Sequence, residues 1–298
     1  MFISSKLKFM TAMLIFGSIG IFVRKIELSS AAIVHWRTLI GSVFLLLMLS
    51  LRKEAFDMNG VQKNRVGLIF AGVVLGGNWI CLFEAYRYAS VGIATMLYYC
   101  APIAVYLLSP MLFRERLTMR KSLGMAAALA GMLVIQFAGS GMGGLSVGII
   151  YGLLSALLYA SLMIINKRIQ GVGGLESTFI QLLVSFVVMT VYLLVTTGKL
   201  LALPVGRDIF LICIVGIIHT GIAFSLYISS MQRLSGSSIS LLSYIDPASA
   251  LLFAFAFLHE RLTLVQLLGA VLIFGGTLFS QCQKSSSKSK ALKESLTG

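Results

Sequence analysis

Charged residues are scarce in this sequence, and acids are the scarcest. Asp, Glu, Lys and Arg make up 11% of the 298 residues, with 10 acids against 24 basic residues. A soluble globular protein has about a quarter of its residues charged. Since 58% of the residues are hydrophobic, the composition excludes an ordinary soluble domain and predicts an all-α membrane protein.

Signatures of enzymes and of cofactor sites are missing or incomplete. The four cysteines have neither disulfide nor metal-ligand spacing, and we interpret them as packing groups. No Gly-x4-Gly-Lys loop is present, which argues against ATP-driven transport by this chain. Gly139–Gly144 matches Gly-x-Gly-x-x-Gly but follows no strand, so we predict a connecting loop. His259 and Glu260 begin a zinc-protease motif, but Thr263 stands where the second His is needed. We therefore predict no enzyme activity and no cofactor, apart from a coupling proton.

Long apolar runs dominate what is present. A membrane-spanning helix needs about 20 apolar residues, whereas a barrel strand needs only about ten, of alternating polarity. The first run lacks a cleavage site and is predicted to be a retained helix, not a signal peptide. The ten predicted spans are Leu7–Val23, Ala31–Leu51, Val66–Ala85, Gly92–Phe113, Ser122–Phe137, Val147–Ile165, Leu175–Val195, Ile209–Ser230, Ile239–Leu258 and Leu264–Cys282.

The net charge of +14 is distributed unevenly between the two sides of these spans. With the N-terminus placed in the cytoplasm, 17 of the 24 basic residues fall in inside segments and 6 in outside segments. Cytoplasmic loops of membrane proteins carry such an excess. The basicity thus predicts two cytoplasmic termini and contact with anionic lipid, not with nucleic acid. Residues 283–298 are predicted to be a disordered basic tail.

Two stretches of the sequence match each other without a gap at a distance of 145 residues. Both lie within near-continuous apolar sequence. A duplicated membrane unit is how many carriers are built, with the ligand site at mid-membrane between the copies. The matched pairs are Tyr99 and Tyr244, Pro102 and Pro247, Glu115 and Glu260, Arg116 and Arg261, Leu117 and Leu262, Thr118 and Thr263, Gly124 and Gly269, and Gly131 and Gly276.

The repeat extends to an aromatic–small pair before a basic helix end. Phe16–Gly17 and Arg24–Lys25 align with Tyr159–Ala160 and Lys167–Arg168 at an offset of 143. Each copy then holds five helices, residues 1–138 and 139–282. Because five is odd, the second copy must enter the membrane upside down relative to the first.

The loops that carry the repeated Glu-Arg-Leu-Thr sequence support this inversion. Three of the four basic residues of the loop 114–121 are absent from its twin, 259–266, which is the change expected for a loop that must cross the bilayer. Since the acid is kept in both loops, we predict a local structural role for Glu115 and Glu260. Such a role would be an ion pair or the capping of a helix end.

Together these features resemble the drug/metabolite transporter superfamily, in particular its EamA-type members, over about residues 7–282. The resemblance implies two inverted five-helix repeats around a central cavity, and movement of small metabolites by alternating access. Known relatives include exporters of amino acids and related metabolites. Many relatives have Trp in the aromatic–small pair where this chain has Phe16 and Tyr159.

Three ionisable residues within predicted spans are candidates for substrate binding, because such groups are costly in a membrane. Arg37 either binds a carboxylate or extends to the interface. Glu84 is either a protonatable or cation-binding group, or the partner of Arg87. Asp246, before a helix-breaking Pro, either lies at a ligand site or makes a polar helix contact. In the first copy, Ala101 takes the place of Asp246.

Neutral residues complete the predicted site, although aromatic and His residues in helices more often serve packing. A cavity for an amino acid or amine needs apolar walls with a few polar groups. Small residues of the fifth and tenth spans are predicted to pack the bundle, with a homodimer seam as the alternative. The neutral candidates are Asn78, Trp79, Tyr98, Tyr99, Tyr159, His219 and Tyr244.

The sequence therefore predicts a secondary carrier in the inner membrane of a bacterium, moving an amino acid or a related zwitterion or amine, with export favoured. Mixed charges at the site favour a zwitterion, and a cationic drug or amine is the nearest alternative. A multi-span membrane enzyme, a channel and a scaffold are further alternatives. The protein is expected to be a monomer or a homodimer.

Overall fold

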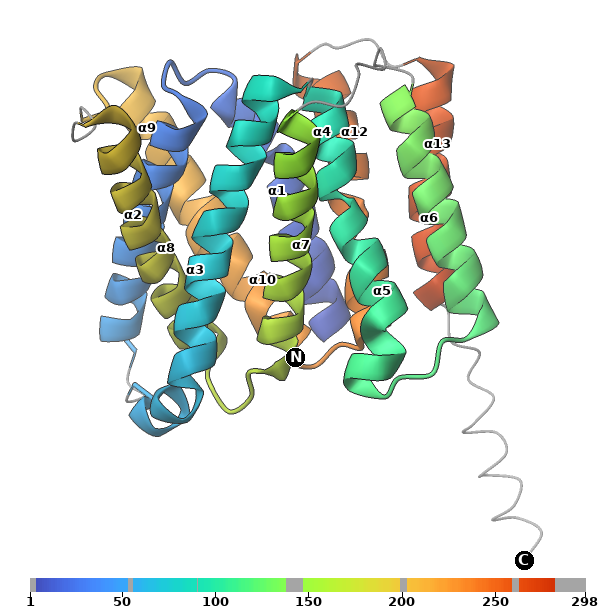
Figure 1. The fold of residues 1–298 in the computed structure, drawn as a ribbon, viewed down its shortest axis with the longest axis horizontal. Coiled ribbons are helices and arrows are strands. Elements are labelled where there is room, and N and C mark those ends of the chain that lie inside the picture. The colour runs from blue at the N-terminus through green and yellow to red at the C-terminus, as the bar shows by residue number, and fades with distance from the viewer. Residues whose placement is uncertain are drawn as a thin grey trace, which may run out of the picture.

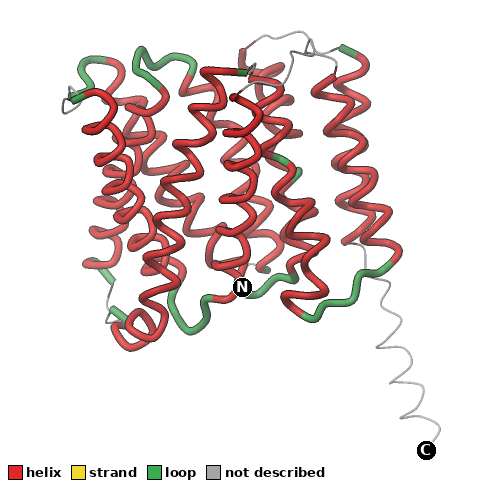
Figure 2. The backbone as a smooth tube through the Cα atoms, in the orientation of Figure 1, coloured by secondary structure: helices red, strands yellow, loops and turns green. Residues whose placement is uncertain are grey.

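The computed structural model describes residues 4–52, 56–89, 91–137, 147–198, 203–258 and 263–281. Within these ranges the regular structure is helical and contains no strand. The helices run roughly parallel or antiparallel between two faces of the molecule, where the described loops gather (Figures 1 and 2). Their bounds are α1 (Ser5–Val23), α2 (Ser30–Ser50), α3 (Met58–Tyr88), α4 (Val91–Tyr98), α5 (Cys100–Phe113), α6 (Met119–Phe137), α7 (Val147–Arg168), α8 (Gly174–Thr197), α9 (Arg207–Ile214), η1 (Val215–Ile222), α10 (Ala223–Met231), α11 (Gly236–Ser243), α12 (Ile245–Leu258) and α13 (Leu264–Gln281).

Over their described residues the predicted spans fall on these helices, but α6, which contains the fifth predicted span, is not among the helices found long and apolar enough to cross a bilayer. Eight helical stretches of the described chain are long and apolar enough to cross a bilayer, and a shorter apolar helix, Leu264–Ser280, follows them. Large apolar side chains such as Leu107, Val191 and Leu268 are more than half exposed on the outside of the bundle. Such a surface suits a lipid environment, in which apolar side chains need no cover.

Two of the predicted spans are broken helices. The first consists of α4 and α5, interrupted at Tyr99, and the second consists of α11 and α12, interrupted at Tyr244. Pro102 and Pro247 follow these breaks at the same distance. A Pro without an N–H cannot continue the helical bonding of the preceding turn, so both breaks follow from the repeated sequence. The break predicted at Pro247 is confirmed.

A further predicted span, Ile209–Ser230, is continuous but contains a π-helix that the sequence did not predict. Its residues form α9, η1 and α10 without a loop between them. The Thr220 Oγ1 hydroxyl donates to the Val215 carbonyl at 3.0 Å, five residues back. Gly216 and Gly221 lie close against Ile40 and Phe44 of α2, so tertiary packing accompanies the wider turn.

Helices α6 and α13 pack backbone to backbone through their glycines. A Cβ placed on Gly131 would lie 2.4 Å from the Gly269 carbonyl oxygen, and one on Gly124 would lie 2.6 Å from the Gly276 carbonyl oxygen. Because the earlier glycine of one helix meets the later glycine of the other, the two helices are antiparallel (Figure 1). The predicted packing role of these four glycines is confirmed, whereas Gly275 faces open space.

Glu115 caps a helix end, as predicted, but the prediction that its role is local is wrong, because the capped helix lies in the second half of the chain. Its carboxylate accepts hydrogen bonds from the backbone N–H groups of Gly236 and Ser237 at 2.7 and 3.2 Å. These N–H groups open α11, so Glu115 caps another helix of the bundle. Its sequence twin Glu260, the predicted loop Gly139–Gly144 and the tail 283–298 lie outside the described residues.

Candidate functional site

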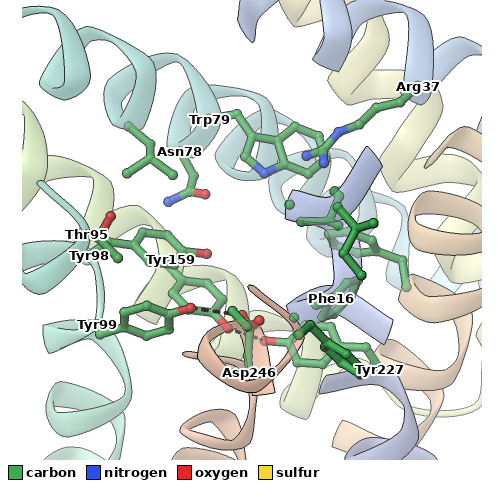
Figure 3. A pocket seen from close by; sticks show the side chains of 18 of the residues that line it. Phe16, Arg37, Asn78, Trp79, Thr95, Tyr98, Tyr99, Tyr159, Tyr227 and Asp246 are labelled. Atoms are coloured by element: carbon green, nitrogen blue, oxygen red, sulfur yellow. Dashed lines mark hydrogen bonds between the residues drawn. The ribbon is translucent and has the colours of Figure 1, made fainter. Parts of the chain in front are cut away.

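A cavity of about 470 Å³ lies between the helices of the bundle (Figure 3). Its volume is within the range of small-molecule sites. Residues of α1, α2, α3, α4, α7, α10 and α12 line its wall, and both broken helices reach it. The wall is mostly apolar, with a few polar groups, which is the composition of a pocket for a small molecule.

The cavity is nearer to one face of the molecule than to the other. Along α1 its wall begins at Phe16 and continues to Arg24, and along α12 it begins at Asp246 and continues to Leu258. These are the later half of α1 and almost all of α12, which is itself the later part of the second broken helix. Both helices run toward the same face, here called the Arg24 face (Figure 1). The opposite face, which carries the loop after α5, is called the Glu115 face.

Arg37 forms part of the wall. Its guanidinium carbon lies 4.4 Å from the centre of the Trp79 ring, in a cation–π arrangement. Its Nε atom is buried and has no hydrogen-bond partner among the described residues. A buried donor without an acceptor is unfavourable. The structure thus places a cation with one unsatisfied donor at the cavity rather than at the surface.

Asp246 lies at the break of the second broken helix and also faces the cavity (Figure 3). Its Oδ2 atom accepts a hydrogen bond from the Tyr99 hydroxyl at 3.0 Å. Among the described residues no basic side chain forms an ion pair with it. Ser240 and Ser243, one turn or two before Asp246, do not line the cavity, and their hydroxyls donate to carbonyls of their own helix.

Tyrosine rings surround Asp246. The rings of Tyr98 and Tyr159 stack with their centres 4.7 Å apart and their planes parallel within 1°. The Tyr227 hydroxyl donates to the Tyr159 hydroxyl at 3.2 Å. Together with Tyr99 these rings present π faces and hydroxyl groups close to one carboxylate. Such a set of groups attracts an organic cation.

Asn78 and Trp79 lie side by side on α3 and both border the cavity. The Asn78 amide nitrogen donates to the Ser155 carbonyl at 2.8 Å and to the Ser155 hydroxyl at 3.0 Å. The amide thus holds α3 against α7. Trp79 instead supplies the aromatic face under Arg37.

Three of the residues predicted for the site do not line the cavity. Glu84 forms an ion pair with Arg87 at 2.9 Å and accepts a hydrogen bond from Tyr192, which satisfies its carboxylate. His219 lies 3.0 Å from the Ser18 hydroxyl, inside η1. Tyr244 is fully buried, and its hydroxyl donates to the Tyr99 carbonyl.

Five aromatic residues of the wall were not among the predicted site residues, namely Phe16, Tyr86, Phe224, Tyr227 and Phe253. Phe16 lines the cavity and packs edge-on against Tyr227, which lines it too. Phe16 is the sequence twin of Tyr159, so the repeat carried a signal for it. Its neighbour Gly17 lets α1 approach α12, since a Cβ there would lie 2.9 Å from the Asp246 carbonyl oxygen. Tyr227 has no such signal in the sequence.

The described residues contain no group of three or more His, Cys, Asp or Glu side chains that could hold a metal ion. The charged groups at the cavity are Arg24, Arg37 and Asp246. The arrangement suits reversible binding of a small charged molecule.

Comparison with known proteins agrees with this geometry. Residues 4–137 and 146–281 each match the EamA-like transporter family, so the chain belongs to that family, as the repeated motifs predicted. It is therefore a multi-pass membrane protein of a transporter family, and its environment is the lipid bilayer. Two matches over the two halves also agree with the duplication seen in the sequence.

Relatives with similar sequences are described as transporters of unspecified substrate. The chain is 30% identical over 277 residues to the uncharacterized transporter YxxF of Bacillus subtilis (strain 168), covering 91% of this chain and 87% of that protein. It is 25% identical over 265 residues to an uncharacterized transporter of Archaeoglobus fulgidus, covering 89% and 91%. One solved crystal structure shares the fold, with a TM-score of 0.82 at 19% identity, covering 93% of this chain and 96% of that one.

Proposed function

We propose that this membrane transporter is a secondary carrier for a small zwitterion, an amino acid or a closely related metabolite, and that it works by alternating access. The observation that carries the proposal is the presence of a cation, Arg37, with no ion-pair partner among the described residues, and an acid, Asp246, on the wall of one cavity. A zwitterion offers the complement of both groups.

The carboxylate of the substrate binds Arg37 in this proposal. A guanidinium can bind a carboxylate through two parallel hydrogen bonds. Trp79 already covers one face of the guanidinium, which leaves its edge available. The substrate would supply the acceptor that Nε lacks.

The amine of the substrate binds Asp246 and the surrounding rings. An ammonium group gains both from the carboxylate and from the π faces of Tyr98 and Tyr159. The substrate must then displace or share the hydrogen bond that Tyr99 gives to Asp246. Asp246 would also carry the coupling proton when the amine is absent.

Alternating access requires two halves that move against each other, and we propose that the halves are inverted repeats. The antiparallel glycine contacts support this relation. The contact of Gly124 with Gly276 becomes the contact of Gly269 with Gly131 when each partner is exchanged for its twin. A pseudo-twofold axis in the membrane plane produces such an exchange. The two helix breaks, at Tyr99 and Tyr244, are exchanged in the same way.

The basic loops support placing both termini in the cytoplasm of a bacterial cell. In this proposal the Glu115 face is cytoplasmic, and the cavity, which lies nearer to the Arg24 face, opens toward the outside. We propose export as the direction of transport.

A carrier for cationic drugs or amines is the second candidate, because the tyrosines around Asp246 favour an organic cation even without a carboxylate. Substrate requirements separate the two candidates. A zwitterion carrier loses affinity when the substrate carboxylate is amidated, whereas an amine carrier does not.

The test is counterflow in proteoliposomes containing the purified protein. Preloaded amino acids should drive uptake of a labelled trace of the same compound, with saturation, and a pH gradient should change the rate if a proton is coupled. A channel would give flux without saturation or counterflow. The proposal is wrong if no zwitterion is exchanged while a simple amine or an anion is.

A further inference from the structure

The cavity has a floor on the side of the Glu115 face, and two layers of polar contacts form it. The upper layer is at the helix breaks. The Tyr244 hydroxyl donates to the Tyr99 carbonyl at 3.1 Å, and the Tyr99 hydroxyl donates to Asp246 at 3.0 Å. Each contact joins the first half of the chain to the second, so the halves cannot separate here without breaking it.

The lower layer is centred on Glu115, which belongs to the first half. Its carboxylate accepts from the N–H groups of Gly236 and Ser237 and from the Ser237 hydroxyl, the last at 3.2 Å. Lys167 of α7 lies 3.3 Å from the same carboxylate, and both side chains are only 15% exposed. All of these partners belong to the second half.

Two lysines extend this layer. The Lys121 ammonium, from the first half, donates to the hydroxyls of Ser237 and Ser235 at 2.7 and 3.2 Å. The Lys167 ammonium donates to the Leu234 carbonyl at 2.6 Å. The segment that opens α11 is therefore held from both sides by charged groups. Hydrogen bonds to charged groups are stronger than those between neutral groups.

The lower layer is connected to the substrate site through one element. The two parts of the second broken helix are α11, whose first N–H groups bind Glu115, and α12, whose first turn carries Asp246. Only Tyr244 separates the two parts. The start of α11 and the first turn of α12 are thus joined by a helix of only eight residues.

We propose that the cluster of Glu115, Lys121, Lys167 and the start of α11 is the gate of the Glu115 face. It holds the cavity closed on that face and must separate before the cavity can open there. This inference rests on the proposed alternating access. It predicts that weakening the cluster shifts the population toward a state open on the Glu115 face.

Accessibility of a cysteine in the cavity tests the gate without any substrate. Ala250 lines the cavity, and Ala250→Cys would be made in a background whose four native cysteines are replaced by Ala. The full-length protein is reconstituted in vesicles and labelled with a membrane-impermeant maleimide from either side. Arg116→Cys, at an exposed position, identifies the side on which the Glu115 face lies.

The cysteine introduced at position 250 should react mainly from the Arg24 face in the parent protein. Glu115→Ala should raise its rate from the Glu115 face by about tenfold, the factor that corresponds to one charged hydrogen bond. Glu115→Gln keeps an acceptor for the N–H groups and should have a smaller effect. Exchanging Glu115 and Lys167 should not restore closure, because a Lys cannot accept from the start of α11.

Arg87→Gln is the matched control. It removes an ion pair that lies within α3 and does not join the halves, so the labelling should stay at the parent rate. The gate is refuted if folded Glu115→Ala and Lys167→Gln both label like the parent. If Glu115→Ala does not fold, the test uses Lys167→Gln and Ser237→Ala instead, and the gate is refuted if both label at the parent rate.

The gate and the substrate proposal can fail separately. Labelling that responds to Glu115→Ala, together with absent counterflow of every zwitterion, supports the gate and refutes the substrate class. If the protein exchanges a zwitterion in counterflow but the labelling rate is the same in these variants as in the parent, only the gate is refuted.

Discussion

The two broken helices of this protein share a backbone but differ in chemistry. Both are interrupted at a Tyr, and both have a Pro three residues later. The residue before that Pro is Ala101 in the first copy, fully buried, and Asp246 in the second, facing the cavity. The shared residues build the break, and the one that differs supplies the charge. The two copies of the scaffold thus differ in chemistry at a position where their sequences diverge.

Asp246→Ala removes this difference and should have the largest effect. We expect transport of a zwitterion to fall roughly 100-fold, because losing one member of a buried charge pair costs about 2–5 kcal/mol. Stability should fall by about 1 kcal/mol or somewhat more, as for loss of the Tyr99 hydroxyl, because the variant removes the acceptor of that buried hydroxyl. Counterflow and a melting curve on the same preparation measure both. Unchanged counterflow would mean that Asp246 does not bind the substrate.

Arg37→Gln tests the cationic end of the proposed site, for comparison with Asp246 at the acidic end. We expect the KM for substrates with a carboxylate to rise about tenfold or more, through loss of a bidentate ion pair. Amines without a carboxylate should keep their KM. An equal loss for both classes of substrate would instead indicate a structural role for the cation–π contact with Trp79.

Gly131→Ala compares a packed glycine with an unpacked one. Its Cβ would meet the Gly269 carbonyl, and forcing extra atoms into such a contact costs about 1–3 kcal/mol. Gly275→Ala is the control, because nothing lies within 4 Å of its Cβ. Unfolding in detergent should show a lower stability for the first variant only. Equal stabilities would contradict the close packing of α6 on α13.

Tyr99→Phe and Tyr244→Phe compare the two hydroxyls at the breaks. Each variant removes one hydrogen bond, and we expect a loss of about 1 kcal/mol of stability in either case. Only Tyr99→Phe should also change transport, because only that hydroxyl contacts Asp246. Transport altered to the same degree in both would place the effect in the floor of the cavity, not at Asp246.

Glu84→Gln should have the smallest effect. Glu84 lies outside the cavity wall, between Arg87 and Tyr192, so we expect KM to change by less than about twofold. Ion pairs with a solvent-exposed partner contribute little to stability, and the thermal midpoint should fall only slightly. A loss of transport as large as that expected for Asp246→Ala would indicate that Glu84 does contribute to substrate binding.

The sequence predicted the helices and the break at Pro247 because run length and Pro act locally. It also identified Arg37 and Asp246, since isolated charges in apolar runs are conspicuous. The sequence did not reveal which face of each helix points toward the cavity. Tyr227 was therefore missed, and Glu84 was grouped with the site although Tyr192, 108 residues away in the chain, satisfies it.

Partners distant in the sequence account for the remaining differences. The hydrogen bond between His219 and Ser18 depends on how η1 packs against α1. The π-helix itself accompanies the contact of Gly216 with Ile40. Neither contact leaves a pattern in the local sequence. The glycines of α6 and α13 were predicted correctly because close packing needs small residues whatever the partner.

The glycine seam between α6 and α13 has a consequence for how such a chain can originate. Gly276 is the twin of Gly131, so its contact with Gly124 is equivalent to a contact between Gly131 of one copy and Gly124 of another. The seam is thus an isologous interface enclosed within one polypeptide. Two separate five-helix chains, inserted in opposite directions, would meet through the same four glycines.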